Sequence, residues 1–268
     1  MAKMVLEMQH ITKTFPGVKA LDDVSLQAYE GEILSIVGEN GAGKSTMQNA
    51  ICGTWRPDSG SILLNGIDVT RLPEHKRAKY LGRVYQDPML GTAAAMQIEE
   101  NLALAFRRGR HRTLMPGIRR AEREEYRRKL TELGLGLENR LTAKAGTLSG
   151  GQRQRLAIAR ALAKKPEVVV FDDSFSALDY KTDARLREEL AKNVTDAALV
   201  VVAQRIATIM HADQIIVLDD GHVVGTGTHE ELLHSCPAYL EIAQSQLSAE
   251  ELGLTQEEIA AVMEGGER

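Results

Sequence analysis

Cysteine, aromatic side chains and long hydrophobic runs are scarce in this chain of 268 residues. Its two cysteines, Cys52 and Cys236, are too few for a disulfide framework and do not have the spacing of metal ligands. The longest apolar runs, such as 198–203 and 215–218, are far shorter than the ~18 residues that a membrane-spanning helix needs. The N-terminus has no basic segment followed by an apolar one, so no secretory signal is expected.

The charge of the chain is close to balanced. It has 33 Lys and Arg residues against 37 Asp and Glu residues, a formal net charge of −4. This balance gives no general electrostatic reason to expect a nucleic acid as a partner. The hydrophobic share of 43% and the charged share of 26% are those of an ordinary globular protein, which excludes disorder and low complexity. We therefore expect a cytoplasmic protein that reaches a membrane only through a partner.

Short apolar segments rich in β-branched residues predict buried strands at 32–37, 167–171 and 198–203. Each segment is followed by polar or glycine residues and then by a helical pattern, which is typical of parallel strands whose carboxyl ends carry the chemistry. Residues 214–218 and 222–224 predict a hairpin across Asp219-Asp220-Gly221. Near the N-terminus, alternating apolar residues and the Asn65-Gly66 turn signal predict antiparallel strands.

The stretch between about Pro88 and Gly146 has a helical texture. Apolar residues recur at helical spacing in 98–106 and 119–133, with many charges around them. We therefore expect an α/β fold with a mainly parallel central sheet, an antiparallel β subdomain and a helical subdomain. In this division a single domain covers 1–245, with a core formed by 1–86 and 156–245 and the helical subdomain at 87–155. The acidic tail, 246–268, is expected either to dock on the domain or to fray.

A glycine-rich loop follows the first of these strands and precedes a helix. It matches the phosphate-binding loop in full, with the residues Gly38-Glu39-Asn40-Gly41-Ala42-Gly43-Lys44-Ser45-Thr46. The glycines allow a tight turn whose N–H groups point at one centre, and the helix adds its positive dipole end. Lys44 then reaches the outer phosphates, and the Ser45 hydroxyl is placed to bind Mg²⁺. The loop predicts a nucleoside triphosphate site.

An acidic residue at the end of a second strand supplies the other part of a metal site. The apolar segment from Val168 delivers Asp172 at its carboxyl end, where a carboxylate is suited to hold Mg²⁺ through water or through Ser45. An acid at a strand end is often only a helix cap, so Asp172 alone would mean little. In combination with the phosphate loop, it predicts a nucleoside triphosphatase.

A second motif, Leu148-Ser149-Gly150-Gly151-Gln152, opens an Arg/Leu/Ala-rich helix from Arg153 to Ala163. With these motifs the chain resembles the ATP-binding-cassette (ABC) ATPases over about residues 5–245. The resemblance implies a P-loop NTPase fold, ATP and Mg²⁺ as cofactors, and a second ABC ATPase domain in a homo- or heterodimer. In that dimer Ser149, Gly150, Gly151 and Gln152 face the γ-phosphate of ATP that is bound to the other subunit. A transmembrane permease subunit and a peripheral position at the inner face of the cell membrane are also implied.

The same resemblance assigns roles to further residues. Phe15 lies where the family places an aromatic ring that stacks on adenine, although a lone Phe is otherwise a core residue. Gln86 matches the glutamine that touches Mg²⁺ and the attacking water. Asp179 matches the loop that crosses between subunits, and Gln204 lies at the switch position, which is normally histidine.

Two departures from the family pattern fall on the hydrolytic groups. Asp173 stands where a glutamate usually polarises the attacking water, and its carboxylate is one methylene shorter. A misplacement of about 1 Å costs about 10²-fold in rate. Gln204 can hydrogen-bond the γ-phosphate but, unlike histidine, cannot carry a positive charge. We therefore expect an ATPase that binds Mg·ATP well and turns it over slowly.

The two parts of the chain resemble different branches of the family. Residues 1 to about 150 are similar to free-standing ATPase subunits of importers, whereas about 150–248 resemble the degenerate nucleotide-binding domain of heterodimeric exporters. An engineered chimera and an unusual natural lineage both fit this pattern. The favoured function is the ATP-binding subunit of an ABC transporter that powers a separate membrane subunit. A soluble ABC-type nucleotide switch and a chimera without a transport role are the alternatives.

Overall fold

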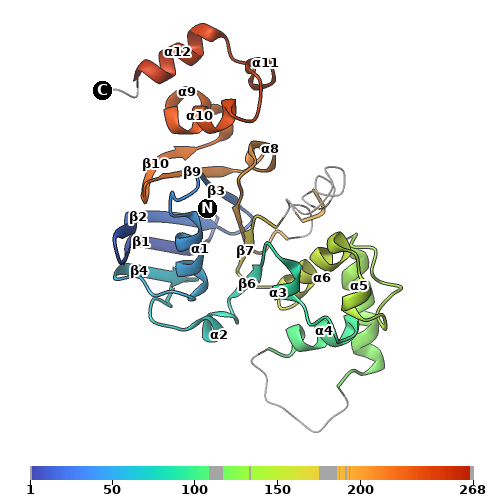
Figure 1. The fold of residues 1–268 in the computed structure, drawn as a ribbon. Coiled ribbons are helices and arrows are strands. Elements are labelled where there is room, and N and C mark those ends of the chain that lie inside the picture. Colours follow the sequence, from blue (N-terminus) through green and yellow to red (C-terminus); the bar gives the residue numbers. More distant parts are fainter. Residues whose placement is uncertain are drawn as a thin grey trace.

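Two β-sheets lie side by side in the computed structural model, which describes residues 2–108, 117–132, 134–174, 186, 188–190, 192 and 194–265 (Figure 1). The smaller sheet has the order β2-β1-β4-β5 and is antiparallel throughout. Its strands are β1 (Met4–Phe15), β2 (Val18–Tyr29), β4 (Ser59–Leu64) and β5 (Ile67–Asp68). This sheet is the antiparallel subdomain that the N-terminal alternation predicts.

The larger sheet has six strands in the order β10-β9-β3-β8-β7-β6. They are β3 (Ile33–Gly38), β6 (Leu81–Val84), β7 (Val168–Asp172), β8 (Ala198–Val202), β9 (Gln214–Asp219) and β10 (His222–Gly227). All neighbouring pairs are parallel except the hairpin of β9 and β10. The mainly parallel sheet, its three central strands and the hairpin are therefore confirmed, with ends that differ from the predicted ones by at most three residues.

Both faces of the larger sheet are buried, which explains why its strands read as continuous apolar runs. In β3, Leu34 and Ile36 belong to one hydrophobic core, whereas Val37 belongs to another on the opposite face. The first core also includes side chains of the smaller sheet and of the helix after β3, such as Leu6 and Met47. The second core includes apolar side chains of the helices in 98–162 and 229–254.

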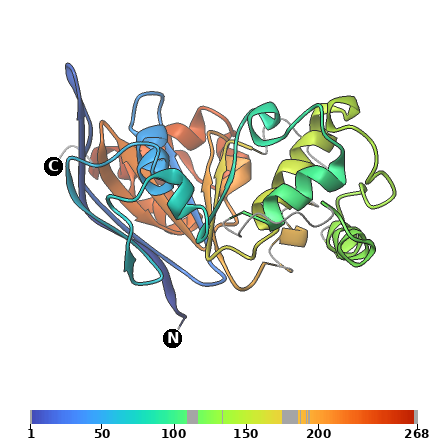
Figure 2. The same cartoon turned by 90° about the horizontal axis from the view of Figure 1, so that it is seen from below.

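Most of the helices form two groups at different sides of the larger sheet (Figures 1 and 2). Helices α3 to α6 lie together on one side, and α9 to α12 lie beyond β9 and β10. The helices and the 3-10 turn η1 are α1 (Lys44–Cys52), α2 (Glu74–Arg77), α3 (Pro88–Gly91), α4 (Ile98–Phe106), α5 (Arg120–Glu132), η1 (Ala145–Thr147), α6 (Gly150–Leu162), α8 (Ile206–Ile209), α9 (His229–Ser235), α10 (Pro237–Gln244), α11 (Ala249–Leu252) and α12 (Gln256–Gly265).

The helical insertion agrees with expectation: α4 has the expected bounds, and α5 lies within 119–133. The expected subdomain boundary at residue 155 falls inside α6, so this helix continues from one region into the other. In the acidic tail, Ser248 caps α11 through a capping box with Glu251. Leu252 and Leu254 are buried, and α12 packs against α9 and α10, so the described part of the tail is docked.

Within the described residues, no helix combines the length and the apolar character that crossing a membrane requires.

Candidate functional site: a phosphate cradle at the strand ends

The predicted phosphate-loop, acidic and switch residues follow neighbouring strands that end at the same edge of the larger sheet. Gly38 is the last residue of β3, and β3 lies next to β8. Asp172 ends β7 and is paired with Val202, the last residue of β8. Because these strands are parallel, the phosphate loop, the acidic pair after β7 and Gln204 all follow carboxyl ends at this edge.

Close approaches of the backbone require glycine in the phosphate loop. A Cβ on Gly38 would clash with the carbonyl oxygen of Leu218, and one on Gly43 would clash with that of Ala20. Gly41 and Gly43 also have left-handed backbone conformations, with φ of 96° and 101°. The loop therefore packs closely between β9 and the start of β2, with the tight backbone that glycine allows.

The loop ends at the N-terminus of α1. Gly43 is the N-cap residue and provides no side-chain acceptor, so the first N–H groups of the helix have no partner within it. These N–H groups belong to Lys44, Ser45 and Thr46, three of the residues predicted to bind phosphate. A helix N-terminus with this arrangement is suited to hold an anion.

Lys44 folds back over the loop. Its ammonium donates hydrogen bonds to the carbonyl oxygens of Gly38, at 2.5 Å, and of Glu39, at 2.6 Å. The residue is only 8% exposed, and this burial lowers the pKa of its ammonium, while the negative charges of Glu39 and Asp173 act in the opposite direction. A positive charge is thus held beside the phosphate loop. The loop 38–43 and the N-terminus of α1 together are called the phosphate cradle below.

The far end of α1 is anchored by a residue that the sequence reasoning did not identify. Arg77 is completely buried and donates to the carbonyl oxygens of Ala50 and Ile51, at 2.6 and 2.8 Å. The same guanidinium donates to the carbonyl oxygens of Leu72 and Thr70. Burial lowers the pKa of Arg77 to about 10. No local pattern signals this role, because α1 lies more than 20 positions away in the sequence.

The acidic pair after β7 meets Gln86. The Gln86 side-chain amide donates to Asp173 Oδ2 at 3.4 Å, which joins two residues that sequence reasoning places at the hydrolytic centre. Asp173 has a left-handed backbone with φ of 41°, and its N–H donates to the carbonyl oxygen of Val202 at 2.8 Å. Asp172 lies 3.7 Å from the guanidinium of Arg83.

Gln204 is exposed just beyond β8, and the C-terminal region holds its backbone. Gln246 donates to the carbonyl oxygen of Gln204 at 2.8 Å and accepts from the N–H of Ile206 at 2.9 Å. No local sequence signal predicts this role of Gln246, because the residue lies in the tail and outside any motif.

The second predicted motif opens α6 as expected. Ser149 is the N-cap: its hydroxyl accepts from the N–H of Gln152, and the Gln152 side chain accepts from the N–H of Ser149. A Cβ on Gly150 would meet no other atom within 4 Å, so nothing inside this chain requires glycine there. In both views α6 lies with the helical group, whereas α1 lies beside the smaller sheet (Figures 1 and 2).

Phe15 contacts another aromatic residue. Its ring meets the ring of Trp55 edge to face, with centroids 4.8 Å apart, and the Lys13 ammonium lies 5.4 Å from its centroid. Both Phe15 and Trp55 are partly exposed. Trp55 is the only tryptophan. The sequence does not predict it as a site residue, because it follows α1 and belongs to no recognised motif.

One predicted site residue lies outside the described residues. Asp179 falls in 175–185 and is not described. Across the described ranges, no group of three or more His, Cys, Asp and Glu residues is arranged to hold a metal ion.

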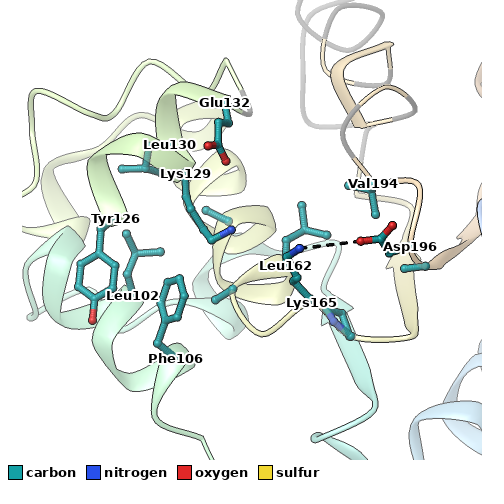
Figure 3. Close-up of a pocket in the computed structure, with 14 residues that line it drawn as sticks. Leu102, Phe106, Tyr126, Lys129, Leu130, Glu132, Leu162, Lys165, Val194 and Asp196 are labelled. Atoms are coloured by element: carbon teal, nitrogen blue, oxygen red, sulfur yellow. Dashed lines mark ion pairs between the residues drawn. The ribbon is translucent and has the colours of Figure 1, made fainter. Parts of the chain in front are cut away.

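A separate cavity of about 180 Å³ lies between the helical group and the edge of the larger sheet (Figure 3). Its lining is mostly apolar and includes Leu102, Phe106 and Leu130. An ion pair between Lys165 and Asp196, 3.8 Å apart, borders it. None of the predicted nucleotide-binding residues lines this cavity, which separates it from the phosphate cradle.

Comparison with known proteins agrees with these motifs. Residues 21–176 match the family model described as "ABC transporter". The chain is 40% identical over 250 residues to an uncharacterized ABC transporter ATP-binding protein of Mycobacterium bovis, with 90% of this chain and 41% of that protein covered. It is 37% identical over 235 residues to the ATP-dependent lipid A-core flippase of Xanthomonas campestris pv. campestris, with 87% and 39% covered. The chain thus spans about two fifths of the length of these relatives.

Solved structures resemble the chain over most of its length. A bacterial Atm1-family ABC exporter with ATP bound is 27% identical, with a TM-score of 0.75, and the match covers 91% of this chain and 42% of the exporter chain. A dimeric ATP-binding cassette in a post-hydrolysis state, bound to ADP and Pi, is 31% identical, with a TM-score of 0.72 and coverage of 83% and 98%. The M. bovis relative and both structures match across residue 150, so the comparisons supply no boundary between two family branches.

Proposed function

Because the chain belongs to the ABC transporter family, we propose that it binds Mg·ATP between two such chains and powers a membrane-embedded part of the transporter. The observation that carries this proposal is the cradle at the N-terminus of α1. There a glycine N-cap leaves N–H groups free of helical acceptors, and the buried Lys44 ammonium adds a positive charge. A triphosphate would replace the loop carbonyls as the partner of Lys44.

The donor set fits magnesium that is shared with a nucleotide. The Ser45 hydroxyl, the Asp172 carboxylate and the Gln86 carboxamide supply oxygen ligands, which suit Mg²⁺, and the ion keeps its remaining sites for phosphate and water. Magnesium bound there would neutralise charge on the outer phosphates. The guanidinium of Arg83, 3.7 Å from Asp172, places a positive charge beside this carboxylate.

A dimer completes the proposed site. The open surface at Gly150 and the N-terminus of α6 offer a second anion-binding helix end that is remote from the cradle of the same chain. Ser149, Gly150, Gly151 and Gln152 would therefore face the ATP held by a partner, and Asp179 would lie at the crossing between subunits. The dimeric cassette among the similar structures supports this arrangement.

Hydrolysis in the proposed dimer is slow. Asp173 is held by Gln86 and by the backbone of β8, yet its side chain is one methylene shorter than glutamate. Gln204 offers a neutral donor in place of a charged one. These two residues favour the role of a degenerate half, which lends its α6 N-terminus to a competent partner. The transporter would lie at the inner face of the cell membrane.

Nucleotide binding tests the proposal directly. We expect Mg·ATP to change the fluorescence of Trp55, which contacts Phe15, and the Lys44→Ala variant to bind ~10- to 100-fold more weakly because a charge-assisted hydrogen bond is lost. Lys76→Ala, which removes an exposed lysine of α2, is the matched control. Equal ATP affinity of the Lys44→Ala variant and the parent would remove the basis of the proposal.

A further inference from the structure

The backbone around Gln204 is tied to the C-terminal region by one side chain. Gln246 Nε2 donates to the carbonyl oxygen of Gln204 at 2.8 Å, and Gln246 Oε1 accepts from the N–H of Ile206 at 2.9 Å. A carboxamide that bonds the C=O of one residue and the N–H two positions later acts as a neighbouring strand would. The two bonds hold the peptide groups on both sides of Arg205, whose φ is −99° and ψ is 124°.

Besides Gln246, the Thr208 N–H, which donates to the carbonyl oxygen of Arg205 at 3.0 Å, and the buried Ile206 side chain hold the segment. Arg205 is the N-cap residue of α8 but makes no side-chain cap, so Gln246 supplies the acceptor for the first N–H of that helix. On the strand side, Ala203 donates to the carbonyl oxygen of Ile36 at 3.3 Å, a long hydrogen bond. Gln204 and Arg205 are both exposed.

Gln246, by contrast, stands on a rigid support. Its N–H and that of Leu247 donate to the carbonyl oxygen of Ala243, so the chain continues from α10 without a break. Leu240 and Ala243 are completely buried, and α10 packs against β3 and β9. The carboxamide therefore follows a helix that packs on β3, the strand whose end carries the phosphate loop.

We propose that Gln246 is a positioning residue for Gln204: its carboxamide sets the direction in which the Gln204 side chain leaves the end of β8. This inference rests on the proposed function, in which Gln204 faces the γ-phosphate. Both of these hydrogen bonds join Gln246 to main-chain atoms of the segment, so they would form in the same way with histidine at position 204.

Hydrogen exchange without nucleotide tests the clamp itself. In the Gln246→Ala variant the Ile206 amide exchanges about five- to tenfold faster, as expected for the loss of one hydrogen bond, and trypsin cleaves faster after Arg205. Gln244→Ala, a change at the exposed end of α10, leaves both rates as in the parent. Gln246→Glu retains the acceptor for the Ile206 N–H but loses the donor to Gln204, and gives an intermediate rate. Unchanged exchange and cleavage in Gln246→Ala overturn the proposal.

Single-turnover hydrolysis of Mg·ATP tests the consequence for Gln204. Gln246→Ala lowers the rate constant severalfold with unchanged ATP affinity, and it has no further effect in a chain that already carries Gln204→Ala. Faster exchange at Ile206 combined with an unchanged hydrolysis rate in the parent background overturns the positioning role but leaves the proposed function intact. Failure of the parent chain to bind Mg·ATP overturns the proposed function, while hydrogen exchange still decides whether the clamp exists.

Discussion

Asp173 combines a constrained backbone with a short side chain. Its left-handed conformation, with φ of 41°, costs about 1 kcal/mol or more for a residue other than glycine. The N–H bond to Val202 and the side-chain contact with Gln86 hold this residue in place. The direction of the carboxylate is therefore set by the fold, and the length of the side chain decides how far the carboxylate reaches.

Lengthening this side chain and restoring a charged residue at position 204 should raise turnover. We expect the double variant Asp173→Glu with Gln204→His to hydrolyse Mg·ATP at least ~10²-fold faster than the parent, because the carboxylate gains about 1 Å of reach and the γ-phosphate gains a charged donor. Phosphate release measures the rate. Thermal unfolding of the variant serves as the control, since glutamate tolerates the left-handed region less well than aspartate. A rate equal to that of the parent would contradict the proposed slow hydrolysis.

Helix α1 shows how an element at the site is held at both ends. Its N-terminus emerges from the phosphate loop, and its last carbonyl groups are bound by the buried guanidinium of Arg77. Gly53 is the C-cap residue, with φ of 82°, and a Cβ there would clash with the Arg77 side chain. The position of the phosphate cradle therefore depends on a contact at the opposite end of the helix.

Removal of the Arg77 guanidinium should destabilise the fold. Arg77→Met keeps most of the apolar volume but removes the guanidinium donor from the Ile51 carbonyl and leaves the Ala50 carbonyl with the 3.3 Å bond from the Gly53 N–H, so we expect a loss of ~3 kcal/mol or more in the free energy of unfolding. Urea denaturation measures this loss. Lys76→Met, at the exposed neighbouring position, should change the stability by less than ~0.5 kcal/mol. A similar small change in Arg77→Met would show that solvent or a rearranged loop replaces the guanidinium.

At the scale of the whole molecule, the two helix N-termini that we propose to bind phosphate lie in different parts of the fold. The cradle lies at α1 beside the smaller sheet, whereas α6 begins within the helical group (Figure 1). Gly150 is open to solvent in the single chain. This division favours a site that forms only when two molecules meet, with the glycine leaving room for a ligand bound to the partner.

A negative charge at the start of α6 should weaken dimerisation without impairing the folding of the single chain. Gly150→Glu places an acid in the first turn of a helix, where it stabilises the fold by ~0.3–1 kcal/mol, but it repels a triphosphate presented by the partner. We expect slightly raised thermal stability and unchanged ATP binding, with ATP-dependent dimerisation weakened more than ~10-fold. Light scattering with and without Mg·ATP measures the size. Ala249→Glu adds the same charge at the start of α11 and serves as the control. Undiminished dimerisation of Gly150→Glu would place the partner's nucleotide elsewhere.

The accuracy of the sequence-based prediction varied between elements for physical reasons. The central strands were predictable because both faces of the larger sheet are buried and the strands are continuously apolar. Strands β1 and β2 extend over 12 residues each, which the sequence pattern did not reveal. Their pairing contains register shifts, and His10 and Asp23 have left-handed backbones, so the strict alternation of a strand is interrupted.

Contiguous motifs carry their own geometry, so the sequence by itself determined the phosphate loop and the N-cap of α6. The steric freedom of Gly43 and the reciprocal bonds of Ser149 with Gln152 act within a few residues. Contacts between distant segments were decided only by the tertiary structure, such as Gln86 with Asp173 and Gln246 with Gln204. Burial of both sheet faces selects a strand order that differs from the chain order, and no local pattern encodes which strand ends then become neighbours.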